Sequence, residues 1–346
     1  MRGAASFARG HRGFVRRAAR GCRLESSGCG SCEHRRAGEL PRAPLPFLTV
    51  SRLHRAFRDP QGRLRGLWAA LLFVLIDLGL IQLFAWLAIA TGLQPASASE
   101  SWWGFYVSIQ LVQLVAFLLA NVALARRFDH EPLSRSGFRA VRGKAWGLLL
   151  AVGLGALVPA FVVAAVALGG SVSLTQGAPP QLLPALALGL PGLSEEVFAR
   201  GYLFYALSRS FLRLPGAVAL TSAFFGALHA FNPSFSVLAL ANLILAGLFL
   251  ASVRLYFDSL WAAIGAHAAF NLSEGVLLGQ PVSGLRREGA VLHLRLAGPE
   301  WLTGGDFGPE ASLLALLALA AASAGLLCGY TRWRASESPG DQARTQ

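Results

Sequence analysis

The sequence predicts an all-α fold, a polytopic membrane helical bundle of about eight transmembrane helices with both termini in the cytoplasm. Of its 346 residues, 54% are hydrophobic and only 14% are charged, whereas soluble domains average about 25% charged residues. Several apolar runs approach the ~20 residues that are needed to cross about 30 Å of hydrocarbon. The distribution of positive charge between these runs is the third observation, and it gives the orientation.

Each apolar run is expected to form one membrane span. In chain order the runs are 67–90, 103–125, 145–168, 181–207, 215–231, 236–256, 259–278 and 311–331. They divide the chain into five segments: a disordered Arg-rich arm (1–50), two spans and a basic cytoplasmic loop (51–144), a core (145–278), an extracytoplasmic loop (279–310), and a last span with a polar tail (311–346). The arm is expected to be disordered because it is rich in Arg, Gly and Ser and has no apolar periodicity.

Positive charge alternates along the chain. Residues 1–66 hold fifteen Arg and four acidic residues, so +11 of the net charge of +13 precedes the first span. The loops after the second, fourth, sixth and eighth spans also carry Arg, whereas the loops 91–102, 169–180 and 232–235 have no Lys or Arg. Because cytoplasmic loops carry an excess of Lys and Arg, both termini are predicted to be cytoplasmic. The charge therefore indicates orientation in a lipid bilayer, and no nucleic-acid partner is expected.

The composition also bears on the source and on metal binding. Usage heavy in Arg, Ala and Gly, with a single Lys, is typical of a GC-rich bacterial genome, so we expect a bacterial cell (inner) membrane protein. Three cysteines and a histidine of the arm form a short CxxC-containing cluster: Cys22, Cys29, Cys32 and His34. One CxxC in a disordered arm is a weak zinc signal.

Three charged residues lie inside the fourth span, in the stretch GLSEEVFAR. Glu196 and Arg200 are four residues apart with the acid first, which favours an ion pair within the helix. Glu195 is turned ~100° away about the helix axis and has no such partner. Since an intramembrane charge is costly and marks a functional site by default, Glu195 is expected to be the working carboxylate.

Two further spans carry polar groups at a similar depth. His229 lies in FFGALHAFNP, and His267 and Asn271 lie in AIGAHAAFNLSEG. Counted at 1.5 Å per residue, these three and Glu195 lie roughly 12–21 Å from the cytoplasmic boundary. His267 and Asn271 share one helix face, as do Phe225 and His229, because each pair is spaced i, i+4. The spacing predicts one shared site.

Other polar residues of the spans have simpler interpretations. Four occur singly and are expected to form interhelical hydrogen bonds: Asp77, Gln82, Asn121 and Asn242. Among them, Asp77 would be the most costly to leave unpaired. Glu274 is expected near the outer boundary, where water solvates it. Pro191–Gly192 is expected to break the fourth span and let water reach the site.

Three motifs in order, EExxxR at Glu195–Arg200, FxxxH at Phe225–His229 and HxxxN at His267–Asn271, resemble the family of CAAX proteases and bacteriocin-processing enzymes. The resemblance covers about 145–278. It implies an intramembrane endopeptidase that acts on protein or peptide substrates. By resemblance, Glu195 is the general base that activates water, and His229 helps to hold that water. His267 and Asn271 would stabilise the oxyanion, with Glu196, Arg200 and Phe225 in support.

The resemblance leaves the metal question open, because the family is described as metalloproteases while a glutamate-type mechanism is also argued. A catalytic Zn²⁺ takes three protein ligands and water, and Glu195, His229 and His267 could supply them. Glu196 would then be the base. Alternatively, Glu195 is the base and no metal is bound directly.

Two classes of non-enzyme compete with the protease. A membrane scaffold or bacteriocin-immunity-type protein could keep the motifs for stability alone. A proton- or ion-coupled transporter also uses buried Glu and His, but the sequence has no inverted repeat and no pair of broken helices at corresponding positions. For the protease, the resemblance implies bacterial peptides, membrane-anchored proteins or bacteriocin precursors as substrates.

Overall fold

The fold is described here from a computed structural model that covers residues 57–91, 102–169, 171–175, 177, 179–285 and 290–336. The predictions for the arm 1–50, including its cysteine–histidine cluster, lie outside these residues.

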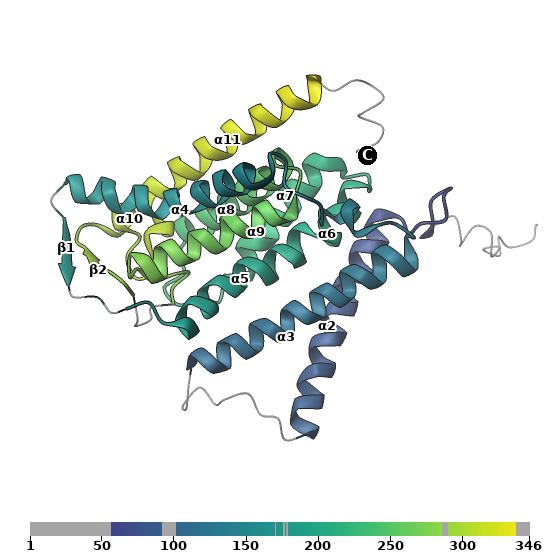
Figure 1. Cartoon of the computed structure of the whole chain (residues 1–346), viewed down its shortest axis with the longest axis horizontal. Helices are drawn as coiled ribbons and strands as arrows, with labels where there is room; N and C mark the ends of the chain where they lie inside the picture. Colours follow the sequence, from purple (N-terminus) through teal and green to yellow (C-terminus); the bar gives the residue numbers. More distant parts are fainter. Residues whose placement is uncertain are drawn as a thin grey trace, which may run out of the picture. The chain divides into compact units, whose positions relative to one another are not determined.

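The described chain is mostly helical, so the all-α prediction is confirmed (Figure 1). The helices are α2 (Gly66–Ala90), α3 (Trp102–Ala123), α4 (Lys144–Leu168), α5 (Leu182–Arg200), α6 (Tyr202–Ser208), α7 (Arg213–Leu228), α8 (Val237–Tyr256), α9 (Leu260–Asn271), α10 (Glu300–Thr303) and α11 (Leu313–Ser336). Single π-helical turns extend α3 over Leu124–Phe128 and α9 over Leu272–Leu277, and short 3₁₀ turns cover Leu133–Ser136 and Pro309–Ala311.

Six segments of the described chain are long and apolar enough to cross a membrane. They are Gly66–Ala90, Trp103–Phe128, Lys144–Leu168, Leu182–Ser208, Val237–Tyr256 and Leu313–Ser336. The two remaining predicted spans overlap helices that are shorter than these six. Helix α7 has 16 residues, and α9 has 12 before its π turn. The multi-pass prediction therefore holds, and the count of eight stays a prediction.

A short antiparallel pair of strands joins two of the predicted loops, 169–180 and 279–310. β1 (Val172–Thr175) pairs with β2 (His293–Leu296), with Val172 opposite Leu296, beside α10 in Figure 1. Each strand alternates apolar and polar residues, as half-exposed strands do. Four residues of alternation are too few to distinguish a strand from a loop in the sequence.

Helix α9 packs against α4, α5 and α8, and glycines let the helices approach closely. A Cβ on Gly155 of α4 would lie 1.9 Å from the carbonyl oxygen of Ala266 in α9, and one on Gly192 of α5 would lie 2.5 Å from the backbone nitrogen of Ala268. Small residues serve the same purpose in other membrane helix pairs. The expected break at Pro191–Gly192 is wrong, since α5 continues through Pro191.

The fourth span breaks instead at Gly201, between α5 and α6. The Tyr202 amide donates a hydrogen bond to Asn121 Oδ1 at 2.7 Å, and Asn121 Nδ2 donates to the carbonyl of Val197 at 3.2 Å. A Cβ at position 201 would lie 2.5 Å from Asn121 Oδ1, so the break requires glycine. The interhelical bond predicted for Asn121 is confirmed, and it fixes the end of α5 that carries the charged residues.

The interhelical hydrogen bonds predicted for the other polar residues of the spans are confirmed in one case and wrong in two. Asn242 Nδ2 donates to the carbonyl of Ser312 at 2.9 Å, as expected. Gln82 is exposed and forms no interhelical hydrogen bond with the described residues. Asp77 is buried, yet neither of its carboxylate oxygens accepts a hydrogen bond from them. The expected interhelical bond is therefore wrong for Gln82 and Asp77.

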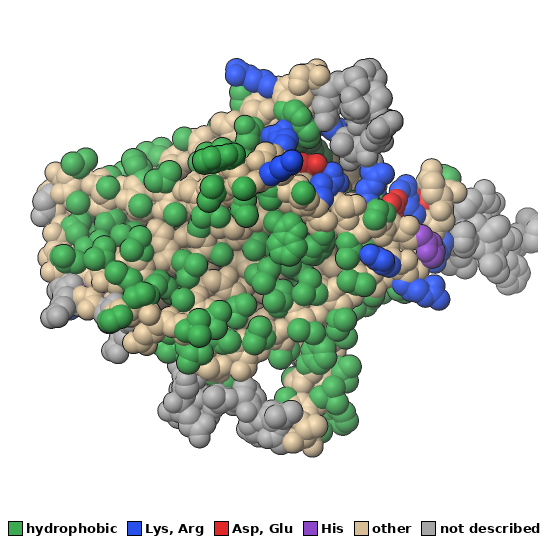
Figure 2. Space-filling model, in the orientation of Figure 1, with side chains coloured by type: hydrophobic (Ala, Val, Ile, Leu, Met, Phe, Trp, Pro, Cys, Tyr) green, Lys and Arg blue, Asp and Glu red, His purple; other side chains and the backbone are tan. Residues whose placement is uncertain are grey.

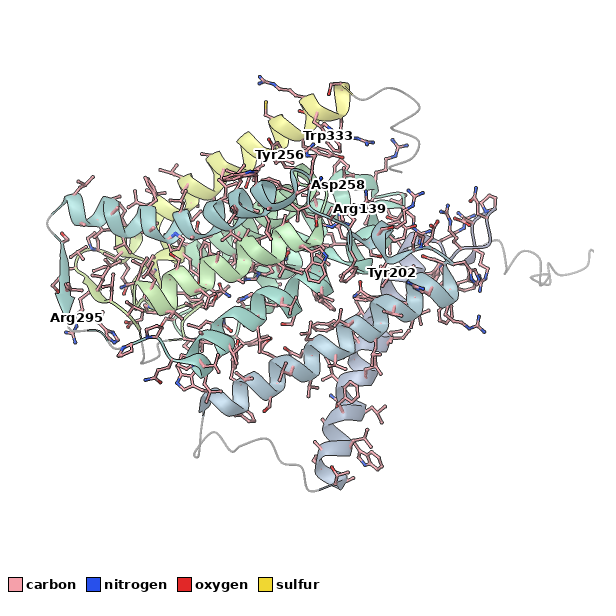
Figure 3. The ribbon with its side chains drawn as sticks, viewed as in Figure 1. Arg139, Tyr202, Tyr256, Asp258, Arg295 and Trp333 are labelled. Carbon is pink, nitrogen blue, oxygen red and sulfur yellow. The ribbon has the colours of Figure 1, made fainter. Side chains whose placement is uncertain are left out.

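The surface agrees with a membrane environment. Figure 2 shows apolar side chains over most of one face, while most Lys and Arg gather at one end of it. At that end Arg139 pairs with Asp258 at 2.8 Å (Figure 3). The Arg142 guanidinium lies over the Trp333 and Tyr256 rings, 4.1 and 4.6 Å from their centroids. The basic residues therefore form an ordered boundary next to an apolar belt, as expected of a multi-pass membrane protein.

Candidate active site

The predicted ion pair on α5 is present and wholly buried. Arg200 Nη1 lies 2.8 Å from Glu196 Oε1, and both side chains have no exposed surface. Arg200 Nη2 donates to the carbonyl of Gly247 on α8 at 2.9 Å. The guanidinium carbon lies 4.8 Å from the centroid of the Phe225 ring. The pair thus joins α5 to α7 and α8 and leaves Glu196 neutralised.

The imidazole of His267 lies between the two adjacent glutamates. Its Nδ1 is 3.1 Å from Glu196 Oε1, and its Nε2 is 4.0 Å from Glu195 Oε2. The contact with Glu196 was not predicted, because it joins two helices that are 71 residues apart in the chain. It means that Glu196 and Arg200 together orient the ring and aim Nε2 at Glu195.

The two glutamates differ in exposure as their helical positions suggested. The Glu195 side chain is 27% exposed, whereas that of Glu196 is 0% exposed. Glu195 forms no ion pair with Lys or Arg of the described chain. Of the two carboxylates, Glu195 is therefore the one that a substrate can reach.

A cavity of about 690 Å³ brings the predicted residues together. All four candidate catalytic side chains line it: Glu195 from α5, His229 from the residue after α7, and His267 and Asn271 from α9. Most of the remaining wall is apolar, with contributions from α2, α3, α5, α7, α8 and α9. This combination of an apolar cavity with a few converging polar groups is typical of a binding or active site.

His229 lies directly after the last residue of α7, so the helix is shorter than the predicted span 215–231. Its Nδ1 is 2.8 Å from the carbonyl oxygen of Phe225. Because a carbonyl oxygen only accepts, Nδ1 carries the proton and Nε2 is free to accept a hydrogen bond. The Phe225 ring is tilted by 44° relative to the His229 ring, with centroids 4.9 Å apart, and meets the His267 ring edge-on at 5.6 Å. Phe225 therefore separates and positions both imidazoles.

Comparison with known families agrees with this geometry. Residues 177–273 match the Rce1-like family of type II CAAX prenyl endopeptidases. The resemblance inferred from the three motifs is thereby confirmed, and the matched segment contains all four candidate residues. No curated protein and no solved structure matches the chain.

The family match supports a membrane-embedded endopeptidase with a peptide substrate. Two further buried acidic residues, Glu274 and Glu310, lie beyond the end of the matched segment. Glu310, from the loop predicted as extracytoplasmic, lines the cavity and accepts a hydrogen bond from the Ser283 amide. Its own amide donates to Glu274 Oε1 at 3.1 Å. Burial raises the pKa of the Glu310 carboxyl, although the Ser283 hydrogen bond and the nearby His229 act in the opposite direction.

The expectation that water solvates Glu274 at the outer boundary is wrong. Glu274 is fully buried and covered by the turn Pro309–Ala311. Sequence reasoning missed Glu310 altogether because no periodicity places the loop 279–310 over the cavity. The only signal in the sequence for an acidic group here was Glu274, an acid seven residues beyond His267 on the same helix face.

The zinc site predicted at Glu195, His229 and His267 stays a prediction. Among the described residues, no three His, Cys, Asp or Glu side chains lie close enough together to hold a metal ion. The Nδ1 atoms of His267 and His229 are engaged by Glu196 and by the Phe225 carbonyl, contacts that zinc-binding histidines commonly make, and Nε2 of each ring is left for a ligand. A catalytic zinc needs three protein ligands around one open position.

Proposed function

We propose that this chain is an intramembrane endopeptidase that hydrolyses peptide bonds of membrane-associated proteins or peptides through water activated by Glu195. One observation carries the proposal: a single apolar cavity is lined by Glu195, His229, His267 and Asn271. The match to an endopeptidase family over 177–273 supports the same activity.

Glu195 and His229 are assigned to the attacking water. Glu195 is the partly exposed carboxylate, and it accepts one proton of the water. His229 has its Nδ1 proton committed to the Phe225 carbonyl, so its Nε2 accepts the second hydrogen of the water as a hydrogen bond. The oxygen is then free to form a bond to the carbonyl carbon of the substrate.

Asn271 and His267 are assigned to the oxyanion that this attack creates. The Asn271 amide donates a hydrogen bond without titrating. His267 donates from Nε2 only when its ring carries both protons, because Nδ1 faces Glu196. A doubly protonated ring is compensated here by carboxylates on both sides. When the carbon–nitrogen bond breaks, Glu195 returns its proton to the leaving amine, and the products are an amine and a carboxylic acid.

We further propose that the reaction uses no directly bound metal. Purified enzyme in lipid bilayers is expected to keep its rate after dialysis against a strong chelator, since Glu195 already supplies the base and no three-ligand group is found among the described residues. The check is the cleavage rate before and after chelation, together with zinc content by elemental analysis. Loss of activity that stoichiometric Zn²⁺ restores would contradict the metal-free mechanism.

The activity itself is tested by comparing protein termini in host cells that carry wild-type protein or Glu195→Gln at equal abundance. We expect a set of new termini that is present with wild type and absent with the variant, because glutamine keeps the shape of the side chain but cannot accept a proton from water. Those termini would also identify the substrate. An identical set of termini, with a folded and abundant variant, would favour the scaffold or immunity-type protein.

A further inference from the structure

Helices α2 and α3 form part of the cavity wall, and both lie outside the segment that matches the endopeptidase family. Helix α3 packs against α5, and α2 packs against α3 and α6 (Figure 1). Four residues of α2 with helical spacing i, i+3, i+4 and i+7 line the cavity: Val74, Asp77, Leu78 and Ile81. One face of α3 lines it too: Tyr106, Gln110, Gln113 and Phe117. Both helices thus present one face to the same space as the candidate catalytic residues.

Asp77 is exceptional among the buried acids of the described chain. Each of the other four has a partner: Glu196 pairs with Arg200, Asp129 pairs with Arg209, Glu274 accepts from the Glu310 amide and Glu310 accepts from the Ser283 amide. Asp77 is 2% exposed, and neither of its oxygens accepts a hydrogen bond from the described residues. Since buried polar groups are almost always paired, this carboxylate indicates an external partner.

The charges around the cavity identify the chemistry of that partner. Three acidic side chains line the cavity, namely Asp77, Glu195 and Glu310, and the lining contains no Lys or Arg. Glu195 is assigned to the reaction, and Glu310 is bound by the Ser283 amide. Asp77 therefore remains as an acceptor for a cation, and Gln113 of α3, which lines the same cavity, carries an amide oxygen that can also accept.

We propose that Asp77 is the anionic centre of a substrate subsite that binds the ammonium or guanidinium group of a Lys or Arg side chain within an otherwise apolar peptide segment. The inference rests on the proposed endopeptidase function and adds the substrate class to it. A basic residue would compensate the buried carboxylate, while the apolar wall receives the neighbouring side chains. The residues of α2 and α3 would then select the substrate, and those on or directly after α5, α7 and α9 would hydrolyse the peptide bond.

The test uses full-length protein in lipid vesicles and short peptides of Leu and Ala. Each peptide carries one Lys, or one norleucine of nearly the same length without the charge, and the position is scanned along the peptide. We expect wild type to cleave the Lys peptide at least about ten-fold faster at one fixed distance from the scissile bond, as loss of a buried charge partner generally implies. Asp77→Asn should remove this ratio.

Two controls make the outcome specific. Asp77→Glu should keep part of the preference for Lys, and Gln82→Ala, an exposed position on the same helix, should keep all of it. Equal cleavage of both peptides by wild type, or a preference that survives Asp77→Asn, would overturn the subsite.

A binding measurement separates this inference from the proposed function. Fluorescently labelled Lys and norleucine peptides are titrated onto Glu195→Gln, with and without Asp77→Asn. Preferential binding of the Lys peptide that disappears with Asp77→Asn supports the subsite even if wild type cleaves neither peptide, a result that would contradict the endopeptidase alone. Equal binding of both peptides would overturn the subsite, whatever the activity.

Discussion

Replacing Glu195 by Gln is expected to lower kcat by about 10²–10⁴-fold, the usual contribution of a general base, with little change in stability. The side chain is 27% exposed in the cavity and forms no ion pair with Lys or Arg of the described chain, so its charge contributes little to folding. The measurement is single-turnover cleavage, in lipid bilayers, of the substrate that the comparison of termini identifies. Thermal unfolding of the same sample shows whether the fold is intact.

Glu196→Gln is the matched control for this experiment, because it makes the same chemical change at the neighbouring residue. Glu196 is held by Arg200 and His267 at 2.8 and 3.1 Å and has no exposed surface. The variant should therefore lose stability and orientation of the His267 ring, with a smaller loss of kcat than Glu195→Gln. The reverse order of the two rate losses would make Glu196 the base and would return Glu195 to the candidate metal ligands.

The helices and the main site residues were predictable because both depend on local spacing. Apolar runs set the helices, and the i, i+4 spacing of Glu196 with Arg200 was sufficient to predict their ion pair. The positions of His229 and Asn271 at similar depth predicted a shared cavity, which exists. The match to the endopeptidase family extends over the same part of the chain.

What could not be predicted depends on contacts between distant segments. The hydrogen bond from His267 to Glu196 joins two helices, and no residue spacing in the sequence links them. The buried position of Glu310 depends on how one long loop folds back over the cavity. Asp77 shows the opposite failure. A rule that polar residues in spans pair with neighbouring helices predicted a partner, and none is found among the described residues. That exception is more informative about function than a confirmed bond would have been.

Replacing Arg200 by Met is expected to produce the largest loss of stability, about 3–5 kcal/mol, because it leaves the carboxylate of Glu196 buried without its main partner. Arg200 has no exposed surface, and its removal also takes away the side-chain donor that lies 2.9 Å from the carbonyl of Gly247. The measurement is the free energy of unfolding in mild detergent, or the shift of the thermal midpoint where unfolding is irreversible.

The double variant Glu196→Gln/Arg200→Met tests the cause of that loss. Removing both charges of a buried pair often costs little, whereas removing one is strongly destabilising. The double variant should therefore be more stable than Arg200→Met alone, although His267 keeps only a neutral acceptor for its Nδ1 proton. If the double variant is as unstable as the single one, Arg200 stabilises the fold through its contacts with Phe225 and Gly247. The ion pair with Glu196 then contributes nothing to the free energy of unfolding.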